Sequence, residues 1–209
     1  MAGGLVAVVD HGLCNVDSIA RALEECGARV EKTRDPRVVA RADRIVLPGV
    51  GAFGAAMRNL AAWGLDLAIR ESVARGTVPF LGICLGMQLM AKTGTEGGAV
   101  PGVDLVDADV VHLVAQGADE RVPHIGWNTV TARTDHPLFN GLAPGSDFYF
   151  VHSYHLRCRD AACAIATTPY CGGFTAAVAL ADRPIFGVQF HPEKSQRNGF
   201  RLIRNFLAI

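Results

Sequence analysis

The chain has 209 residues, half of them hydrophobic, and its 20 basic residues balance 20 acidic residues, so the formal net charge is zero. Only 19% of the residues are charged, below the roughly 25% usual for soluble domains. This composition excludes a disordered chain, which would be less apolar and more highly charged. The lack of a basic excess argues against binding to nucleic acid or to an anionic membrane surface. The length suits one large domain.

The apolar runs give no sign of export or of a membrane span. The first run, 5–9, ends at Asp10 and has no basic segment before it, so it is too short for a signal peptide. The longest apolar stretch, 79–91, is interrupted by two glycines and a glutamine and falls short of the roughly 20 residues that a transmembrane helix needs. We therefore expect a cytoplasmic protein.

The six cysteines have neither metal-binding nor redox spacing. None forms a CxxC pair, and none has histidines at zinc-finger spacing. Because we expect no export, we expect reduced thiols rather than disulfides. We also expect no metal or other cofactor. Five of the cysteines are expected to be small buried or half-buried residues, and Cys84 is considered separately. The six stand at positions 14, 26, 84, 158, 163 and 171.

Strands and helices alternate through the first hundred residues. Continuous apolar, Val-rich runs predict strands that are covered on both faces. Between them, apolar residues recur at helical spacing, and the first helix is expected to end before Gly27. The expected strands are 5–9, 29–33, 44–47 and 78–83. The first expected helix starts at about Val16, and the others are 52–62, 65–75 and 85–92.

Shorter strand-like runs, separated by Pro, Gly and Asp, fill the second half of the chain. They predict an antiparallel or mixed extension of the sheet, and 199–207 predicts a closing amphipathic helix. The expected strands are 107–114, 129–132, 148–153, 163–167, 176–180 and 185–190. The fold class is therefore α/β, with an open, mostly parallel central sheet, flanking helices and an antiparallel extension. With no linker or repeat, residues 1–209 are expected to form a single domain.

One segment, 79–88, carries a candidate nucleophile. It reads Pro-Phe-Leu-Gly-Ile-Cys-Leu-Gly-Met-Gln, so a buried strand ends just before Cys84 and a helix begins just after it. This is the strand–turn–helix pattern of a nucleophile elbow, with Cys in place of Ser. A helix N-terminus lowers the pKa of a thiol, and the backbone N–H of Leu85 could stabilise an oxyanion formed beside Cys84. The alternative is a buried cysteine at a Gly-rich strand end.

A second segment, 185–193, carries a candidate base. It reads Ile-Phe-Gly-Val-Gln-Phe-His-Pro-Glu, which places His191 at the end of a strand and Glu193 just past a stiff proline. A cysteine nucleophile needs a base, and the base needs a carboxylate to fix its tautomer. His191 and Glu193 fit those two roles.

With its surrounding residues, the order Cys84, His191, Glu193 resembles the class I glutamine amidotransferases, whose fold is flavodoxin-like. Within that group the chain most resembles the glutaminase subunits of imidazole glycerol phosphate synthase, and the resemblance covers nearly the whole chain. It rests on the motifs LPGVGAF at 47–53, FLGICLGMQL at 80–89, VPHIGWNT at 122–129, FYFVHSY at 148–154 and GVQFHPEKSQ at 187–196.

The resemblance implies that L-glutamine is hydrolysed to glutamate and ammonia through a thioester on Cys84. The ammonia would pass to a separate synthase (cyclase) subunit with a (β/α)8 barrel, in a 1:1 heterodimer. That partner would make imidazole glycerol phosphate for histidine biosynthesis.

The same resemblance implies roles for further residues. Val50, after a peptide flip, and Gly51 would complete an oxyanion hole with Leu85. Residues expected to bind the substrate are Gln88, Glu96, His152, Ser153 and Tyr154. Residues expected to face the partner are Asn15, Pro123, Trp127, Asn128, Lys194 and Ser195.

The chain departs from the family pattern at four positions. The usual first loop, Asp-Tyr-Gly-x-Gly-Asn-Leu, here has His11 in place of the aromatic residue, Cys14 in place of a glycine and Val16 in place of the leucine. Later, Cys171 follows Tyr170 where Tyr-Gly is common. These departures leave the candidate triad intact and bear on loop geometry and partner docking.

Three other functions remain open from the sequence. A paralogous amidotransferase subunit could feed ammonia to a related cyclase in another pathway, such as sugar modification. A silent scaffold could activate a barrel partner without chemistry, which the intact Cys84, His191 and Glu193 set disfavours. A cysteine peptidase would need an open cleft for an extended chain, whereas a glutamine pocket should be small and closed.

Overall fold

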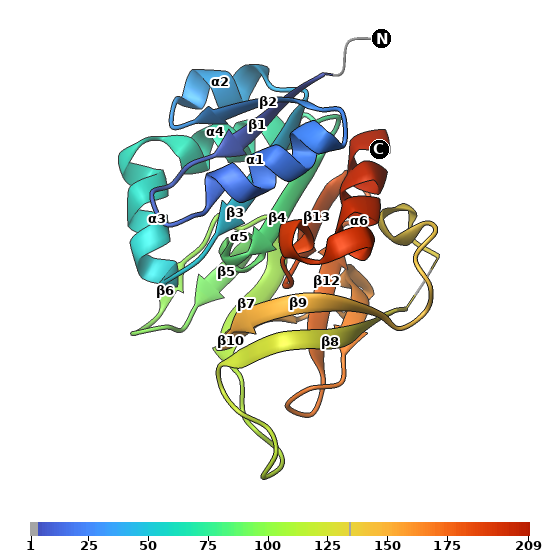
Figure 1. Ribbon diagram of the computed structural model, residues 1–209. Coiled ribbons are helices and arrows are strands. Elements are labelled where there is room, and N and C mark those ends of the chain that lie inside the picture. Colours follow the sequence, from blue (N-terminus) through green and yellow to red (C-terminus); the bar gives the residue numbers. More distant parts are fainter. Residues whose placement is uncertain (1–3, 134) are drawn as a thin grey trace.

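A nine-stranded sheet forms the centre of the computed structural model, which describes residues 4–133 and 135–209 (Figure 1). The strand order is β2-β1-β3-β4-β13-β12-β11-β8-β9. In chain order, the strands of this sheet are β1 (Leu5–Val9), β2 (Arg29–Thr33), β3 (Arg44–Gly49), β4 (Phe80–Cys84), β8 (His124–Ala132), β9 (Ser146–His152), β11 (Ala164–Thr168), β12 (Phe174–Ala179) and β13 (Ile185–Val188).

The sheet has a parallel half and an antiparallel half, as predicted. Strands β2, β1, β3, β4 and β13 pair in parallel, and β12, β11, β8 and β9 continue the sheet in antiparallel pairs. The expected α/β class, with an antiparallel extension, is confirmed. Strand β8 begins at His124, five residues before the predicted start, because it pairs with β9 from His124 opposite His152 to Val130 opposite Ser146.

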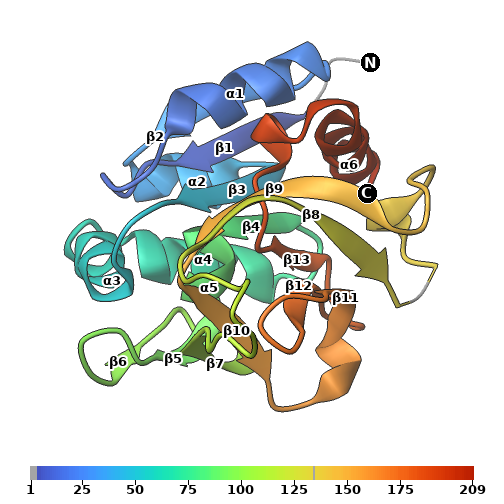
Figure 2. The same ribbon diagram turned by 60° about the horizontal axis from the view of Figure 1, so that its bottom comes forward.

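Helices cover both faces of the parallel half (Figure 2). Helices α1 and α6 lie on one side, and α3, α4 and α5 lie on the other. The helices are α1 (Val16–Glu25), α2 (Pro36–Arg41), α3 (Phe53–Ala62), α4 (Leu65–Ala74), α5 (Leu85–Leu89) and α6 (Gln196–Ala208), with one-turn 3-10 helices η1 (Pro137–Phe139), η2 (Ala161–Cys163) and η3 (Pro192–Lys194). None of the helices in residues 4–133 and 135–209 is long and apolar enough to cross a membrane.

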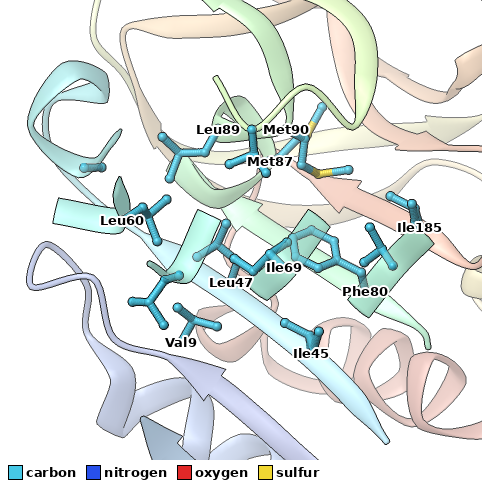
Figure 3. Close-up of a cluster of buried hydrophobic side chains, with 14 of the residues drawn as sticks. Val9, Ile45, Leu47, Leu60, Ile69, Phe80, Met87, Leu89, Met90 and Ile185 are labelled. Atoms are coloured by element: carbon cyan, nitrogen blue, oxygen red, sulfur yellow. The ribbon is translucent and has the colours of Figure 1, made fainter. Parts of the chain in front are cut away.

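Alternate side chains of the central strands enter two separate hydrophobic cores. Ile45 and Leu47 pack with Phe80 into the core under α2–α5, shown in Figure 3. Val46 and Leu81 point the other way, into the core under α1 and α6. Because successive strand residues face opposite sides, a strand buried on both faces must be apolar throughout, which is why these strands could be predicted from continuous runs.

A second, four-stranded sheet was not predicted. Its order is β10-β7-β5-β6. The predicted helix 85–92 ends at Leu89, because the Met90 carbonyl accepts the N–H groups of Leu105 and Val106 and the chain then continues as a strand. The strands of this sheet are β5 (Ala91–Gly94), β6 (Val100–Pro101), β7 (Val106–His112) and β10 (Tyr154–Cys158).

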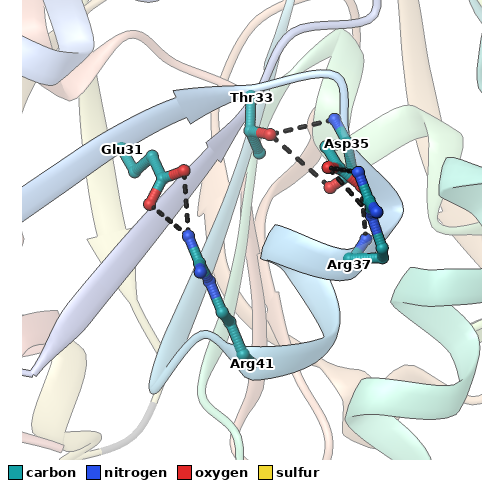
Figure 4. A network of polar contacts seen from close by, with 5 residues as sticks. All are labelled: Glu31, Thr33, Asp35, Arg37 and Arg41. Carbon is teal, nitrogen blue, oxygen red and sulfur yellow. Dashed lines mark hydrogen bonds and ion pairs between the residues drawn. The ribbon is translucent and has the colours of Figure 1, made fainter.

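Helix α2 was also missed by the sequence analysis, although its start is well capped (Figure 4). The Asp35 carboxylate accepts the backbone N–H of Arg37 at 2.9 Å, and Thr33 Oγ1 accepts the N–H of Asp35 at 2.9 Å. Arg41 pairs with Glu31 of the edge strand β2. The cap contributes about 1 kcal/mol, whereas such exposed ion pairs contribute up to about 1 kcal/mol at most.

The expectation of fully reduced cysteines is wrong for one pair. Cys158, at the end of β10, and Cys163, in η2, form a disulfide, and their Cα atoms are 6.7 Å apart. The one-turn helix η2 folds the chain back so that the two side chains meet. The expectation rested on cellular compartment, whereas the pairing follows from this turn. The other four cysteines have free thiols.

Glycines allow α5 to pack directly against the central strands. A Cβ added at Gly86 would collide with the Leu47 carbonyl oxygen. A Cβ added at Gly82 would come within 2.7 Å of the Gly86 carbonyl oxygen and of Met90 Sδ. The close contact of α5 with β3 therefore depends on the lack of a side chain at Gly86, and its close contact with β4 depends on the lack of one at Gly82.

We predict that Gly86→Ala lowers the free energy of unfolding by about 1–3 kcal/mol or more, because the added methyl group overlaps fixed backbone. Gly54→Ala in α3 is the matched control, since its new Cβ would find ordinary contacts of 3.5 Å and longer. That control should leave stability unchanged or slightly raised. Urea unfolding of both variants measures the difference, and equal stabilities would contradict the packing argument.

Candidate active site

Three adjacent parallel strands bring the candidate site together at their carboxyl ends. In the register of the sheet, Gly49 at the end of β3 lies opposite Cys84 at the end of β4. On the other side of β4, Val188 of β13 lies opposite Ile83, and the chain then runs on to His191. Ligand sites of open α/β sheets form at such strand ends.

Cys84 occupies a strained turn between β4 and α5. Its backbone has φ 53° and ψ −109°, a conformation that is uncommon for a residue with a side chain. The residue is buried, with 4% of its surface exposed, and it is the N-cap of α5. Backbone strain of this kind concentrates at functional sites. The turn directs one sulfur atom at the start of a helix, as the nucleophile-elbow pattern predicts.

His191 and Glu193 form a buried pair beside this turn. The His191 Nδ1 and Glu193 Oε1 atoms are 2.8 Å apart, and both side chains are at least 94% buried. The Nε2 atom has no hydrogen-bond partner of good geometry among the described residues. Burial alone lowers the pKa of His191, but the adjacent Cys84 sulfur, together with Glu193, raises it to about 10. His191 is therefore favoured as the charged imidazolium at neutral pH.

Ser195 holds the loop that carries this pair. Its hydroxyl donates to the His191 carbonyl at 2.6 Å and accepts the backbone N–H of Tyr149 at 3.0 Å. The His191 N–H in turn donates to the Tyr149 carbonyl at 2.9 Å. Because Ser195 is buried, its side chain braces this loop from inside, and its expected place at the partner interface stays a prediction.

A pocket of about 390 Å³ opens in front of Cys84. It brings together the expected oxyanion and substrate residues, and it also includes Pro123, which was expected at the partner interface. Its lining residues are Val50, Gly51, Ala52, Cys84, Leu85, Gln88, Glu96, Pro123, Val151, His152, Ser153 and Tyr154. The volume of the pocket lies within the range of roughly 300–1,000 Å³ that is typical of small-molecule sites.

Within the pocket, Gln88 and Glu96 are each partly engaged by the protein. Gln88 Nε2 donates to the Tyr154 carbonyl at 2.7 Å and to Gln189 Oε1 at 3.1 Å. Glu96 Oε2 accepts the Phe53 N–H at 2.8 Å and so satisfies the N-terminus of α3, whose own N-cap residue makes no side-chain bond. Each side chain keeps one oxygen, Gln88 Oε1 and Glu96 Oε1, that can accept a hydrogen bond from a ligand.

Both ring nitrogens of His152 are occupied inside the protein. Nδ1 lies 2.8 Å from the Tyr154 carbonyl, and Nε2 lies 3.1 Å from Nδ1 of His124. The residue therefore borders the pocket without presenting a free ring nitrogen to it.

Gln189 is a site residue that the sequence analysis missed. Its side chain is fully buried, and its Nε2 donates to the Cys84 sulfur at 3.7 Å. The available signal was its position two residues before His191 in a predicted strand, because residues at that spacing share one face.

The backbone beside the pocket holds the Val50 N–H away from Cys84. That N–H donates to the Leu13 carbonyl at 2.9 Å. Two residues earlier, at the end of β3, the Pro48 carbonyl lies 2.9 Å from His11 Nε2. The expected role of Val50 therefore requires its peptide to turn over, and Gly51, which has φ +99°, lowers the barrier to such a change.

The other departures from the family pattern lie outside the pocket. Cys14 Sγ donates to the Asp10 carboxylate at 3.4 Å, and burial together with this carboxylate raises the pKa of the thiol to about 12. Cys171 has φ 52° and donates its N–H to the Glu120 carboxylate. Cys14 is thus an inert thiol, and Cys171 supports a surface turn.

The residues expected at the partner interface fall into two groups. Asn15 caps α1 and, with exposed Lys194, borders a small cavity behind His191 and Glu193. Trp127 is 48% exposed on β8.

Ile125 on β8 is 61% exposed. The sequence analysis did not single this residue out. Asn128 points inward instead, and its Nδ2 lies 3.2 Å from His124 Nε2. The exposed apolar face of β8 therefore includes Ile125 and Trp127, and Asn128 lies only at its edge.

A larger concavity, of about 890 Å³, lies elsewhere, between β10 and the sheet strands β8, β11 and β12. It is lined by arginines and several threonines but no free thiol or carboxylate. Size alone would favour it, but Cys84 lines the smaller pocket, and the His191–Glu193 pair lies beside Cys84. Across residues 4–133 and 135–209, no three His, Cys, Asp or Glu side chains gather as metal ligands would.

Comparison with known proteins identifies the family. The family model described as "Glutamine amidotransferase class-I" matches residues 7–209. The chain belongs to the class-I glutamine amidotransferases. Two curated relatives of this amidotransferase are both named imidazole glycerol phosphate synthase subunit HisH. The protein from Moorella thermoacetica is 47% identical over 96% of this chain and 93% of its own length. The protein from Salinibacter ruber is 43% identical over 98% and 94%.

Solved structures share the fold of this amidotransferase. A putative GMP synthase protein from Thermoplasma acidophilum superposes with a TM-score of 0.74 at 22% identity, covering 98% of this chain and 92% of that one. A structure described as glutamine amidotransferase gives 0.75 at 19% identity, covering 97% of both chains.

We predict that the amidotransferase keeps His191 protonated well above neutral pH. The pKa of His191 in the folded chain lies above the ordinary value of about 6.5. Protonated His191 therefore stabilises the fold fully below about pH 6.5, and this stabilisation is lost as the pH rises to about 10. Cys84→Ala removes the neighbouring sulfur and should lower the His191 pKa. NMR titration of the ring measures both values, and a wild-type pKa near 6.5 would contradict the ion pair.

Proposed function

We propose that this chain hydrolyses L-glutamine to glutamate and ammonia, with Cys84 as nucleophile, His191 as acid and base, and Glu193 as the orienting carboxylate. The observation that carries the proposal is the buried 2.8 Å contact of His191 with Glu193 beside a cysteine held at φ 53°. Residues 1–209 act as a single domain in this proposal.

The chemistry follows from the protonation states. The Cys84 thiolate attacks the carboxamide carbon of glutamine, and the His191 imidazolium gives its Nε2 proton to the leaving nitrogen, which departs as ammonia. A γ-glutamyl thioester remains on Cys84. Neutral His191 then takes a proton from water, the hydroxide attacks the thioester carbon, and the thiolate leaves with the proton held on His191. Glutamic acid is released and ionises.

Two backbone N–H groups would stabilise the oxyanion. Leu85 is the first residue of α5, where an N–H has no acceptor inside the helix. The Val50 N–H would join it after leaving the Leu13 carbonyl, with Gly51 permitting the turn of the peptide. Removing one such donor typically costs 10²–10³-fold in rate, so the bond from Val50 to Leu13 describes a less active state.

The substrate would be recognised by the remaining acceptors of the pocket. Gln88 Oε1 and the free oxygen of Glu96 can accept from the substrate ammonium. Ser153 and Tyr154 would contribute backbone groups to the lining, as would His152. These contacts suit a free amino acid, which favours glutamine over a peptide.

We further propose that the ammonia passes to a separate synthase subunit with a (β/α)8 barrel, in a cytoplasmic 1:1 heterodimer that makes imidazole glycerol phosphate for histidine biosynthesis. The names of the relatives and their coverage support this partner. Ile125 and Trp127 form an apolar face suited to an interface core, and Asn15, Pro123 and Lys194 lie near the candidate site. A paralogous cyclase in another pathway is the alternative, which complementation of a strain lacking the histidine-pathway subunit would decide.

We predict that Cys84→Ala reduces glutamine-dependent synthesis by at least about 10³-fold, because no thioester can form. Synthesis from added ammonium, measured in the complex with the partner, should stay at the wild-type rate. This second measurement is the control for folding and partner binding. Glutamate release by the variant at the wild-type rate would overturn the assignment, and loss of both activities would indicate a disrupted complex.

A further inference from the structure

A continuous series of hydrogen bonds connects strand β8 with the candidate nucleophile. On the β8 side, Asn128 Nδ2 lies 3.2 Å from His124 Nε2, and His124 Nδ1 lies 3.1 Å from His152 Nε2. His152 Nδ1 lies 2.8 Å from the Tyr154 carbonyl. Three elements, β8, β9 and β10, are joined by these contacts.

The same carbonyl connects this series to Cys84. The Tyr154 oxygen also accepts from Gln88 Nε2 at 2.7 Å, and Gln88 Nε2 donates to Gln189 Oε1 at 3.1 Å. Gln189 Nε2 then donates to Cys84 Sγ at 3.7 Å. Of the side chains in the series, those of His124, His152, Gln88 and Gln189 are all buried.

The donors and acceptors allow only one arrangement of protons. An asparagine Nδ2 can only donate, so His124 Nε2 must accept and His124 Nδ1 must carry the hydrogen. That hydrogen is donated to His152 Nε2, which leaves the His152 hydrogen on Nδ1, facing the Tyr154 carbonyl. Both rings are therefore neutral Nδ1–H tautomers, and neighbouring hydrogen bonds of the series polarise one another.

The surroundings of the two rings favour this neutral state. His124 stacks on Tyr170 at 4.1 Å between ring centres and on Phe150 at 4.8 Å. Burial lowers the pKa of His124 to about 4 and that of His152 to about 3.

The titratable groups that act on His152 are His124, His155 and His191, and each lowers its pKa. The two rings thus remain uncharged, whereas His191, which lies beside Cys84 at the end of the series, is favoured in its charged form.

We propose that His124 is a positioning residue for glutamine hydrolysis, which, through His152, Tyr154 and Gln88, holds the Gln189 amide against the Cys84 sulfur. This inference rests on the proposed function. The Gln189 N–H stabilises negative charge on the sulfur, and the fixed Gln88 amide directs its Oε1 towards the substrate.

The position of β8 connects this series with the expected partner face. Residues alternate along the strand, so His124 and Asn128 point inward while Ile125 and Trp127 are exposed. A partner docked on the exposed side chains would fix the backbone that carries His124. The hydrogen-bonded series therefore connects the strand that carries the exposed Ile125 and Trp127 side chains with Cys84.

A double-mutant cycle tests the coupling in the assembled complex with the synthase subunit. His124→Phe keeps an aromatic ring for stacking but removes both nitrogens, and Gln189→Met keeps the length of the side chain but removes the amide. We expect each variant to lower kcat for glutamine hydrolysis by about 10-fold. The double variant should also lose about 10-fold in kcat, because either substitution alone already breaks the series and the second adds no further effect.

His155→Phe is the matched control, since His155 also packs near Phe174 but lies outside the series. Its kcat should remain at the wild-type value. A loss of about 100-fold in the double variant, the product of two independent effects, would overturn the proposal.

Nitrogen-15 NMR of the wild-type histidines provides a readout that needs neither activity nor a variant. At about pH 7 the spectra should assign His124 and His152 as neutral Nδ1–H tautomers. An Nε2–H tautomer at His124 would overturn the proposal even if glutamine is hydrolysed. If the wild-type complex hydrolyses no glutamine while the tautomers are as expected, the proposed function fails and the hydrogen-bonded series stands.

Discussion

Strand β4 lies between two parallel neighbours, β3 and β13, and the three strands end side by side. From these ends come the Val50 backbone, Cys84 with Leu85, and His191 with Glu193. The arrangement requires α5 to start directly at the end of β4 and to pack against β3, which only glycine at position 86 permits. A tight helix contact therefore fixes both the strained turn at Cys84 and the distance between the parts of the site.

Two different electrostatic environments meet at the Cys84 sulfur. On one side, the buried Glu193 carboxylate and the sulfur itself favour charged His191. On the other side, burial among apolar and aromatic neighbours keeps His124 and His152 neutral. Each ring then accepts a hydrogen bond at Nε2 and donates one from Nδ1. A thiolate needs both, since an imidazolium balances its charge and a neutral amide donor orients it without adding charge.

Much of the fold could be predicted from sequence because the central strands are buried on both faces and so are apolar throughout. The short elements β5, β6 and α2 could not, because they have only 4, 2 and 6 residues, and their residues are partly exposed, so no hydrophobic period can be recognised. The candidate site divides in the same way. Cys84 and His191 stand in motifs with local turn chemistry, whereas Gln189 and His124 have a role only once strands far apart in the chain are in register.

The central claim is that Cys84 attacks the side-chain amide of free glutamine. The most direct measurement treats the complex with the synthase partner with a glutamine analogue that has an alkylating carbon in place of the amide, and then maps the labelled peptides by mass spectrometry. The account predicts one adduct per chain, on Cys84, that glutamine protects against and that is absent at Cys14, Cys26 and Cys171. Labelling of another residue, or no glutamine-protected adduct on Cys84 in an active complex, would contradict it.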